Sequence, residues 1–207
     1  MIQAIPKPLS FQEFIDLYPD DGKRYEFVNG QIVEMKPLGA HDKVTDYIED
    51  RLKEEARRLD LDYVITGKAT IRVTTPNDQV RGRTPDVSVI PEDIYDAYLE
   101  SSDAIEEPIQ MAVEVCSRNY LDDYRDKLDE YERKGIQEYW LVDYKPQARP
   151  KYLNPNIPTV FVYRLVNGEY EMQVFQGSDR ILSATFPDLG LTVDQIVIAS
   201  QPRKRTS

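Results

Sequence analysis

The chain of 207 residues contains one cysteine and one histidine. A single cysteine cannot form an internal disulfide bond, which agrees with a reducing cytoplasm. One cysteine and one histidine also cannot supply the nitrogen and sulfur ligands of a usual zinc site. If the protein binds a metal ion, its ligands must be carboxylate oxygens, and these favour magnesium or manganese.

Long apolar runs and an excess of positive charge are also missing. No run approaches the ~20 residues that cross a bilayer, and the opening MIQAIPKPLSFQEF lacks the charged and then apolar order of a signal peptide. We therefore expect a cytoplasmic protein with no membrane partner. Lysine and arginine number 26 against 37 aspartate and glutamate, a net charge of −11. That balance argues against non-specific coating of nucleic acid, which needs many cationic contacts, but it permits a small cationic or metal-neutralised cleft.

The rest of the composition, 41% apolar and 30% charged, is ordinary for a globular protein. The pattern predicts one α/β domain with a mixed sheet over residues 1–199, followed by a frayed basic tail at 200–207. Hairpins are expected at Asn29-Gly30 and Asn167-Gly168. Helices are expected within 9–18, 41–59 and 121–134, and further strands at 62–67, 69–75, 85–90, 110–117, 138–144 and 180–186.

The run MAVEVC at 111–116 places a carboxylate inside an apolar strand. Side chains alternate along a strand, so Glu114 shares one face with Ala112 and Cys116. A buried charge costs several kcal/mol unless it has a partner. Asp86 begins another strand, and if the two strands pair, Asp86 and Glu114 approach on one face. Two such carboxylates repel unless they share a proton or a cation, and a divalent cation is the simplest solution.

A lysine on the following helix can reach the same place. At 100° per residue, Lys127 lies about 40° from Tyr131 and about 60° from Tyr124, at the edge of the apolar stripe. From there its ammonium can lean back over the strand that carries Glu114.

These residues resemble a known family. The ordered set is Pro85-Asp86, Glu114-Val115-Cys116-Ser117, Asp123, Lys127 and Tyr131, followed by GIQEYWLVD. It resembles the Uma family of bacterial putative restriction endonucleases, and YEFVNGQIVEM and VYRLVNGEYE extend the likeness to most of the chain. That family belongs to the PD-(D/E)xK nuclease superfamily, whose members carry Asp, then Glu or Asp, a spacer, and Lys.

The resemblance implies a restriction-endonuclease-like mixed sheet flanked by helices, with a β-hairpin near each terminus. It also implies that Asp86 and Glu114 hold magnesium or manganese, with the backbone carbonyl of Val115 as a further ligand. Because Cys116 stands where the superfamily has its lysine, Lys127 would be the displaced lysine. DNA would be the substrate. Glu26 matches an early glutamate of the family, although by itself it is equally a solvent-facing strand residue.

Each candidate also has a purely structural explanation. Asp86 is a common turn residue, and the Lys127 stem can cover apolar surface while its head pairs with Asp123 or Glu130. His41 begins a helix, where a histidine needs no special role, and Cys116 suits a small buried side chain.

Two functions therefore stay open. In the first, the protein is a metal-dependent endonuclease in which Lys127 orients the attacking water or stabilises the transition state. In the second, it is a catalytically silent interaction protein on a nuclease scaffold, as the acidic net charge suggests. The sequence does not distinguish DNA from RNA or duplex from single strand, and it shows no interface for the symmetric dimer that would cut both strands.

Overall fold

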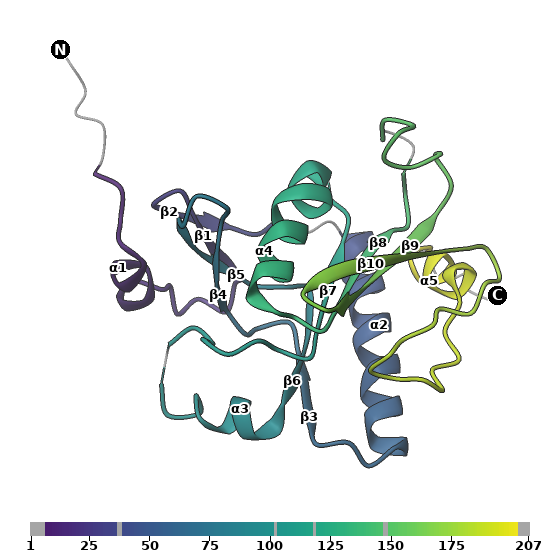
Figure 1. The fold of residues 1–207 in the computed structure, drawn as a ribbon, viewed down its shortest axis with the longest axis horizontal. Coiled ribbons are helices and arrows are strands. Elements are labelled where there is room, and N and C mark those ends of the chain that lie inside the picture. The colour runs from purple at the N-terminus through teal and green to yellow at the C-terminus, as the bar shows by residue number, and fades with distance from the viewer. Residues whose placement is uncertain (1–6, 37–38, 102, 118, 147–148, 203–207) are drawn as a thin grey trace.

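The computed structural model describes residues 7–36, 39–101, 103–117, 119–146 and 149–202, and contains two β-sheets with helices around them (Figure 1). The smaller sheet has the strand order β2-β1-β5-β4, and the larger has β10-β9-β8-β7-β6-β3. Only β7 and β8 pair in parallel, so the larger sheet is mixed. The expected mixed α/β fold is confirmed.

The elements have the following bounds. The smaller sheet contains β1 (Tyr25–Val28), β2 (Gln31–Glu34), β4 (Ile71–Thr74) and β5 (Val80–Arg83). The larger contains β3 (Tyr63–Thr66), β6 (Val87–Pro91), β7 (Met111–Val115), β8 (Glu138–Asp143), β9 (Thr159–Val166) and β10 (Glu169–Gln176). The helices are α1 (Phe11–Asp16), α2 (Gly39–Arg58), α3 (Glu92–Asp96), a π-helical turn (Asp122–Asp126), α4 (Lys127–Lys134) and α5 (Val193–Ala199).

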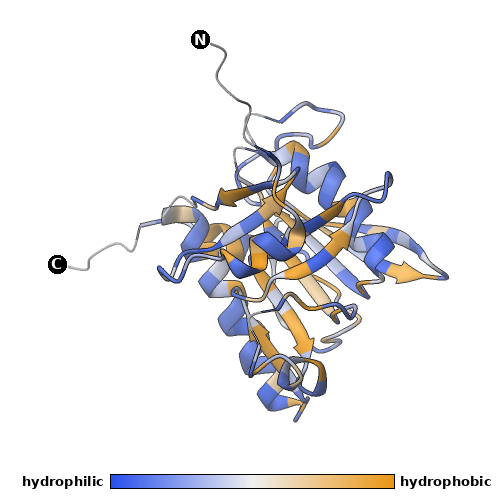
Figure 2. Ribbon diagram, turned by 90° about the vertical axis from the view of Figure 1, so that its left-hand side faces the viewer, coloured by the Kyte–Doolittle hydropathy of each residue, from blue (hydrophilic) through white to orange (hydrophobic). Residues whose placement is uncertain are grey.

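The two faces of the larger sheet carry separate hydrophobic cores. On one face α2 and α5 pack over the sheet, and on the other the π-helical turn and α4 do so together with β4. Strand β7 contributes to both, because Val113 and Val115 join the first core while Ala112, and Cys116 directly after the strand, join the second. In Figure 2 many strand residues are apolar, whereas the helices carry both hydrophilic and apolar residues. Glu114 therefore belongs to the face that α4 covers.

Local sequence signals account for several boundaries. Ser10 Oγ accepts the Glu13 backbone N–H at 3.1 Å and the Ser10 N–H donates to Glu13 Oε2 at 2.7 Å, a complete capping box for α1. The hairpin turn Asn29-Gly30 has φ of 52° and 76°, the left-handed values that this turn requires. Gly135 ends α4 at φ 81° for the same steric reason.

The expected strand at 180–186 is wrong. Only Arg180 forms an isolated bridge, to Thr192. The segment instead bends around a buried carboxylate, because the Thr185 N–H and hydroxyl both donate to Glu138 Oε2, at 2.8 and 2.9 Å. Ile181 and Phe186 fill the core from an irregular backbone.

Three elements have no counterpart among the expected ones: β5, α3 and α5. The sequence of β5, VRGR, is too polar to predict a buried strand, since its arginines enter the interior only with carboxylate partners from other elements. Within the described part of the chain, no helix is both long and apolar enough to cross a bilayer. The predicted tail lies outside the described residues from 203 onward.

Candidate active site

A cavity of about 170 Å³ lies where the ends of β6 and β7 meet the first hairpin, the start of α2 and the π-helical turn. Its lining is rich in charge, with more acids than bases. The acids are Glu26, Asp86, Glu114, Asp122 and Asp123, and the basic side chains are Arg24, Lys36, His41 and Lys127.

Strand pairing brings the first two predicted carboxylates together. Strands β6 and β7 are antiparallel with Val87 opposite Val113, and the same register places Asp86 opposite Glu114. The Val115 backbone N–H donates to Asp86 Oδ2 at 2.9 Å, which ties the end of one strand to the other. Both carboxylates are almost completely buried and both line the cavity.

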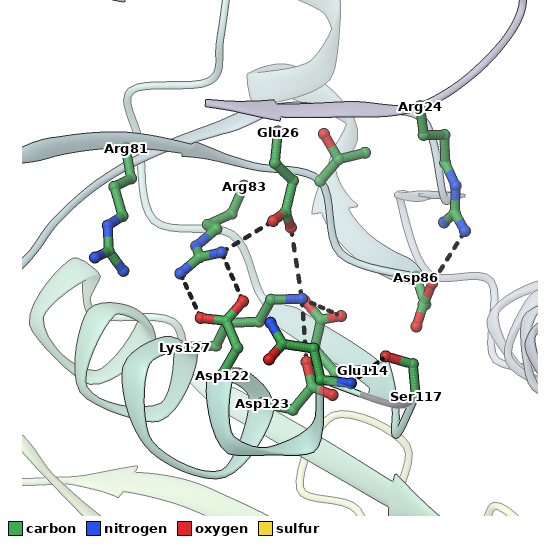
Figure 3. Close-up of polar contacts among 12 residues, drawn as sticks. Arg24, Glu26, Arg81, Arg83, Asp86, Glu114, Ser117, Asp122, Asp123 and Lys127 are labelled. Carbon is green, nitrogen blue, oxygen red and sulfur yellow. Dashed lines mark hydrogen bonds and ion pairs between the residues drawn. The ribbon is translucent and has the colours of Figure 1, made fainter. Parts of the chain in front are cut away.

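Lys127 reaches these acids from the helix (Figure 3). Its Nζ lies 2.9 Å from Glu114 Oε2, 3.2 Å from Asp123 Oδ1 and 3.5 Å from Glu26 Oε1. The lysine is 4% exposed, so it lies inside the protein, as a place beside the apolar stripe permits. A π-helical turn precedes it, in which the Lys127 N–H bonds to the carbonyl of Asp122, five residues back. Such wide turns are frequent at functional sites.

The ionisation of this cluster follows from its burial. Burial raises the pKa of Glu114 to about 8, and the charges of Asp86, Asp123 and Glu26 add to this, while Lys127 opposes it. Burial likewise raises the pKa of Asp123 to about 6 against the pull of Lys127. Burial alone would lower the pKa of Lys127, but Glu114, Glu26 and Asp123 together raise it well above its usual value. Lys127 therefore remains a protonated ammonium. Its single positive charge faces three carboxylates, those of Glu114, Asp123 and Glu26.

Glu114 has a second partner on its other oxygen. The Tyr131 hydroxyl, also buried, donates to Glu114 Oε1 at 2.6 Å. The carboxylate is thus oriented by α4 at two points, one on each oxygen.

Asp86 is held in the opposite ionisation state by Arg24, which the sequence did not single out, and by His41, to which it gave no special role. Arg24 Nη2 donates to Asp86 Oδ1 at 3.1 Å, and His41 Nε2 lies 3.0 Å from Oδ2. Burial would raise the pKa of Asp86, but the hydrogen bond and charge of His41, with Arg24, lower it below its usual value. Neither residue carries a spacing signal, since Arg24 precedes a hairpin and His41 begins a helix. Only the tertiary fold brings them to Asp86.

Glu26 points into the site, so its interpretation as a solvent-facing residue is wrong. It is 6% exposed, and Oε2 accepts a hydrogen bond from Arg83 Nη1 at 2.9 Å. Its other oxygen, 3.5 Å from Lys127 Nζ, has no hydrogen-bond partner among the described residues. Arg83 is fully buried and also pairs with Asp122 and Glu130, so it links the smaller sheet to the helix that carries Lys127.

The remaining candidates have structural roles. Cys116 is buried in the second core, and burial raises the pKa of its thiol well above the usual value, which agrees with a small packed side chain. Ser117 Oγ accepts the Asn119 N–H at 3.3 Å and turns the chain toward the helix (Figure 3).

Comparison with known proteins identifies the family. The family model Uma2, described as putative restriction endonuclease, matches residues 11–194. The chain belongs to the Uma2 family. No curated protein matches. One similar solved structure is the crystal structure of a putative nuclease belonging to DUF820 from Anabaena variabilis, with a TM-score of 0.64 and 20% identity over 94% of this chain and 100% of that one.

Uma2 membership confirms the resemblance found in the sequence, and the solved structure supports the fold. In this Uma2 chain the residues that the sequence singled out, Asp86, Glu114, Lys127 and Glu26, all line one cavity. Their catalytic and metal-binding roles remain predictions.

The cavity of this Uma2 protein can be tested for its fit to a divalent cation. The donors are all oxygen atoms, which suit magnesium or manganese. The raised pKa of Glu114 indicates a place that lacks positive charge, and so does Glu26 Oε1, which has no hydrogen bond among the described residues and lies 3.5 Å from Lys127 Nζ. No ready-made cluster of three acidic, histidine or cysteine ligands exists among the described residues, and both oxygens of Asp86 already have partners. The oxygen donors fit a divalent cation. To bind it, Asp86 would exchange part of its contact with Arg24, or Glu114 part of its contact with Lys127, for a contact with the ion.

Proposed function

We propose that this protein is a metal-dependent endonuclease that hydrolyses phosphodiester bonds of DNA. The observation that carries the proposal is the convergence of Asp86, Glu114 and Lys127, from two paired strands and a helix, in one acidic cavity of a Uma2 chain. A cytoplasmic location, and a symmetric dimer to cut both strands, are parts of the proposal that rest on the sequence alone.

Asp86 and Glu114, with the carbonyl of Val115, would hold magnesium or manganese. When bound, the ion would offset charge on the scissile phosphate and lower the pKa of a water molecule. Arg24 and His41 orient the Asp86 carboxylate and keep it ionised. Tyr131 orients Glu114 through Oε1, so that Oε2 faces Lys127.

Lys127 acts through its charge. Because the surrounding carboxylates raise its pKa, it cannot serve as a general base near neutral pH. A fixed ammonium can instead orient the attacking water or stabilise charge that develops on the phosphate. Glu26 and Asp123 hold the ammonium in place beside Glu114.

A second function, that of a catalytically silent interaction protein, is favoured by one observation. Both oxygens of Asp86 are satisfied by Arg24, His41 and Val115 without a metal, as in a purely structural ion-pair network. The net charge of −11 also does not favour approach to a duplex.

The test is cleavage of plasmid DNA, single-stranded DNA and RNA with magnesium and with manganese at low salt, since salt weakens phosphate contacts. Wild type is compared with Glu114→Gln and with the control Glu171→Gln, which changes an exposed glutamate of β10. We expect metal-dependent cleavage that Glu114→Gln lowers by at least 100-fold and the control leaves unchanged. If folded Glu114→Gln still cleaves, the assignment of Glu114 as a metal ligand is refuted. If folded wild type cleaves none of the substrates, the interaction-protein function is favoured.

A further inference from the structure

A second and larger cavity, of about 890 Å³, opens beside the candidate active site. It lies between α1 with the loop after it, the connection from β3 to β4, and α3 with the loop that follows. In Figure 1, α1 and α3 lie on the same side of the molecule, α1 beside the smaller sheet and α3 below it. Arg24 lines both cavities, so the larger one, here called the side groove, adjoins the site at this residue.

Two cations line the side groove close to the site. A Cβ atom on Gly67 would lie 3.5 Å from Arg24 Nη1 and 2.5 Å from the Asp86 carbonyl oxygen, so the guanidinium lies against this piece of backbone. The next residue, Lys68, is exposed and forms no ion pair with any residue that the structure describes. Lys23 also lines the groove, but Glu34 and Asp21 already neutralise it. Lys68 is therefore a cation without an ion-pair partner among the described residues, and Arg24, which pairs with Asp86 through Nη2, has its Nη1 left for a phosphate group.

Aromatic rings line another part of the side groove. Tyr18, Tyr95 and Tyr98 all contribute, and each ring is half-buried and so held in place. The Tyr98 hydroxyl donates to Glu107 Oε2 at 2.7 Å and accepts the Glu106 N–H at 3.0 Å, which fixes its ring. Nucleic-acid bases stack on such rings, whatever the base, because every base has a π face.

Size and charge limit what the side groove can take. A volume of about 890 Å³ is within the range of about 300–1,000 Å³ for pockets that enclose small molecules. That volume suits one or two nucleotides, not a duplex. Asp16, Asp20 and Asp103 also line it, so the groove is not a continuous basic track. Its chemistry suits one phosphate at the site end with a base further in.

We infer that the side groove binds the nucleotide next to the scissile phosphate, as a single strand or an unpaired end. Its phosphate lies at Arg24 and Lys68 and its base against Tyr95 and Tyr98. The inference rests on the proposed nuclease function and specifies its substrate: a nucleic acid with at least one unpaired nucleotide beside the cleaved bond.

The experiment measures binding without turnover. Fluorescence anisotropy of a labelled 12-nucleotide single-stranded DNA, and of the same sequence as a blunt duplex, is recorded at low salt in EDTA. The variants are Lys68→Gln, Tyr95→Leu and Tyr95→Phe. Lys151→Gln, an exposed lysine that does not line the groove, is the matched control.

We expect Lys68→Gln and Tyr95→Leu each to weaken single-strand binding by about fivefold or more, the effect of losing about 1 kcal/mol or more of phosphate or stacking contact. Tyr95→Phe keeps the ring and should bind within twofold of wild type, as should Lys151→Gln. Blunt duplex binding should change less than twofold in every variant. Lys68→Gln alters only an exposed side chain, so its result does not depend on whether Tyr95→Leu folds.

The inference would be overturned if Lys68→Gln bound single-stranded DNA as tightly as wild type. It would also be overturned if the variants lost affinity equally for the duplex and for the single strand. The result is separable from the proposed function, because Glu114→Gln should bind the single strand no more weakly than wild type. If the groove variants weaken single-strand binding but the wild type cleaves no substrate, only the proposed nuclease function is refuted. If the wild type cleaves but the groove variants bind the single strand as tightly as wild type, only the inference about the side groove is refuted.

Discussion

Replacing Glu114 by glutamine should make the metal-free protein more stable at high pH, although it removes a buried ion-pair partner of Lys127. Burial and the neighbouring acids raise the pKa of Glu114 from 4.5 to about 8. Between those two values the folded state binds a proton that the unfolded state has released. The free energy of unfolding therefore falls as pH rises through this window.

The structure bounds the size of this effect. The difference between 4.5 and about 8, at about 1.36 kcal/mol per pKa unit, gives about 5 kcal/mol as an upper limit. Glutamine cannot ionise, so the variant does not lose free energy of unfolding as pH rises through this window. Its side-chain oxygen can still accept the hydrogen bond from the Tyr131 hydroxyl. Lys127 retains Asp123 and Glu26 as partners.

The assay is urea denaturation of wild type and Glu114→Gln at pH 5, 7 and 9 in EDTA. We expect similar free energies of unfolding at pH 5 and an advantage of a few kcal/mol for the variant at pH 9. Manganese should then stabilise wild type and leave the variant unchanged, since ligand binding to the folded state raises stability. A variant that is less stable than wild type by the same amount at every pH would show that Glu114 is a structural ion-pair partner and refute this reasoning.

Three further results are expected. Arg24→Gln removes the cation from Asp86 Oδ1, so manganese affinity by titration calorimetry should stay equal or rise while cleavage falls; weaker manganese binding would contradict this. Arg83→Met removes one cationic partner from each of Glu26, Asp122 and Glu130 and should cost about 3–5 kcal/mol in urea denaturation, whereas Arg164→Met, at the exposed arginine of β9, should cost less than about 0.5 kcal/mol. Glu138→Gln turns an amide donor toward the donors that its carboxylate now accepts, among them Trp140 Nε1, and should cost about 1–3 kcal/mol with a change in tryptophan fluorescence; an unchanged melting curve and spectrum would count against that network.

Local sequence signals were sufficient for most elements and for the central pair of acids. The capping box at Ser10, the Asn-Gly turns and the strict alternation along 111–116 are properties of neighbouring residues, and each has a steric or hydrogen-bonding cause within a few positions. Alternation alone placed Glu114 on one face of its strand, and strand pairing then brought Asp86 opposite. The Uma2 family match agrees with the resemblance that these residues carry.

The same local signals gave wrong predictions where the conformation of a segment depends on contacts with residues far away in the sequence. Residues 180–186 alternate like a strand, but hydrogen bonds from Thr185 to Glu138 hold them in an irregular course. Strand β5 was missed for the converse reason, because arginines that look solvent-exposed in the sequence are buried by Glu26, Asp122 and Glu130 from other elements.

The site itself shows the same division. The sequence determined which acids and which lysine could meet, since residue type, alternation and helical spacing are local. Only the tertiary structure determined that Lys127 is almost completely buried, that Glu26 faces inward, and that Arg24 and His41 hold Asp86. Burial also sets the charges of these groups, because a pKa depends on solvent exclusion and on every charge nearby in space, and neither is a property of neighbouring residues in the chain.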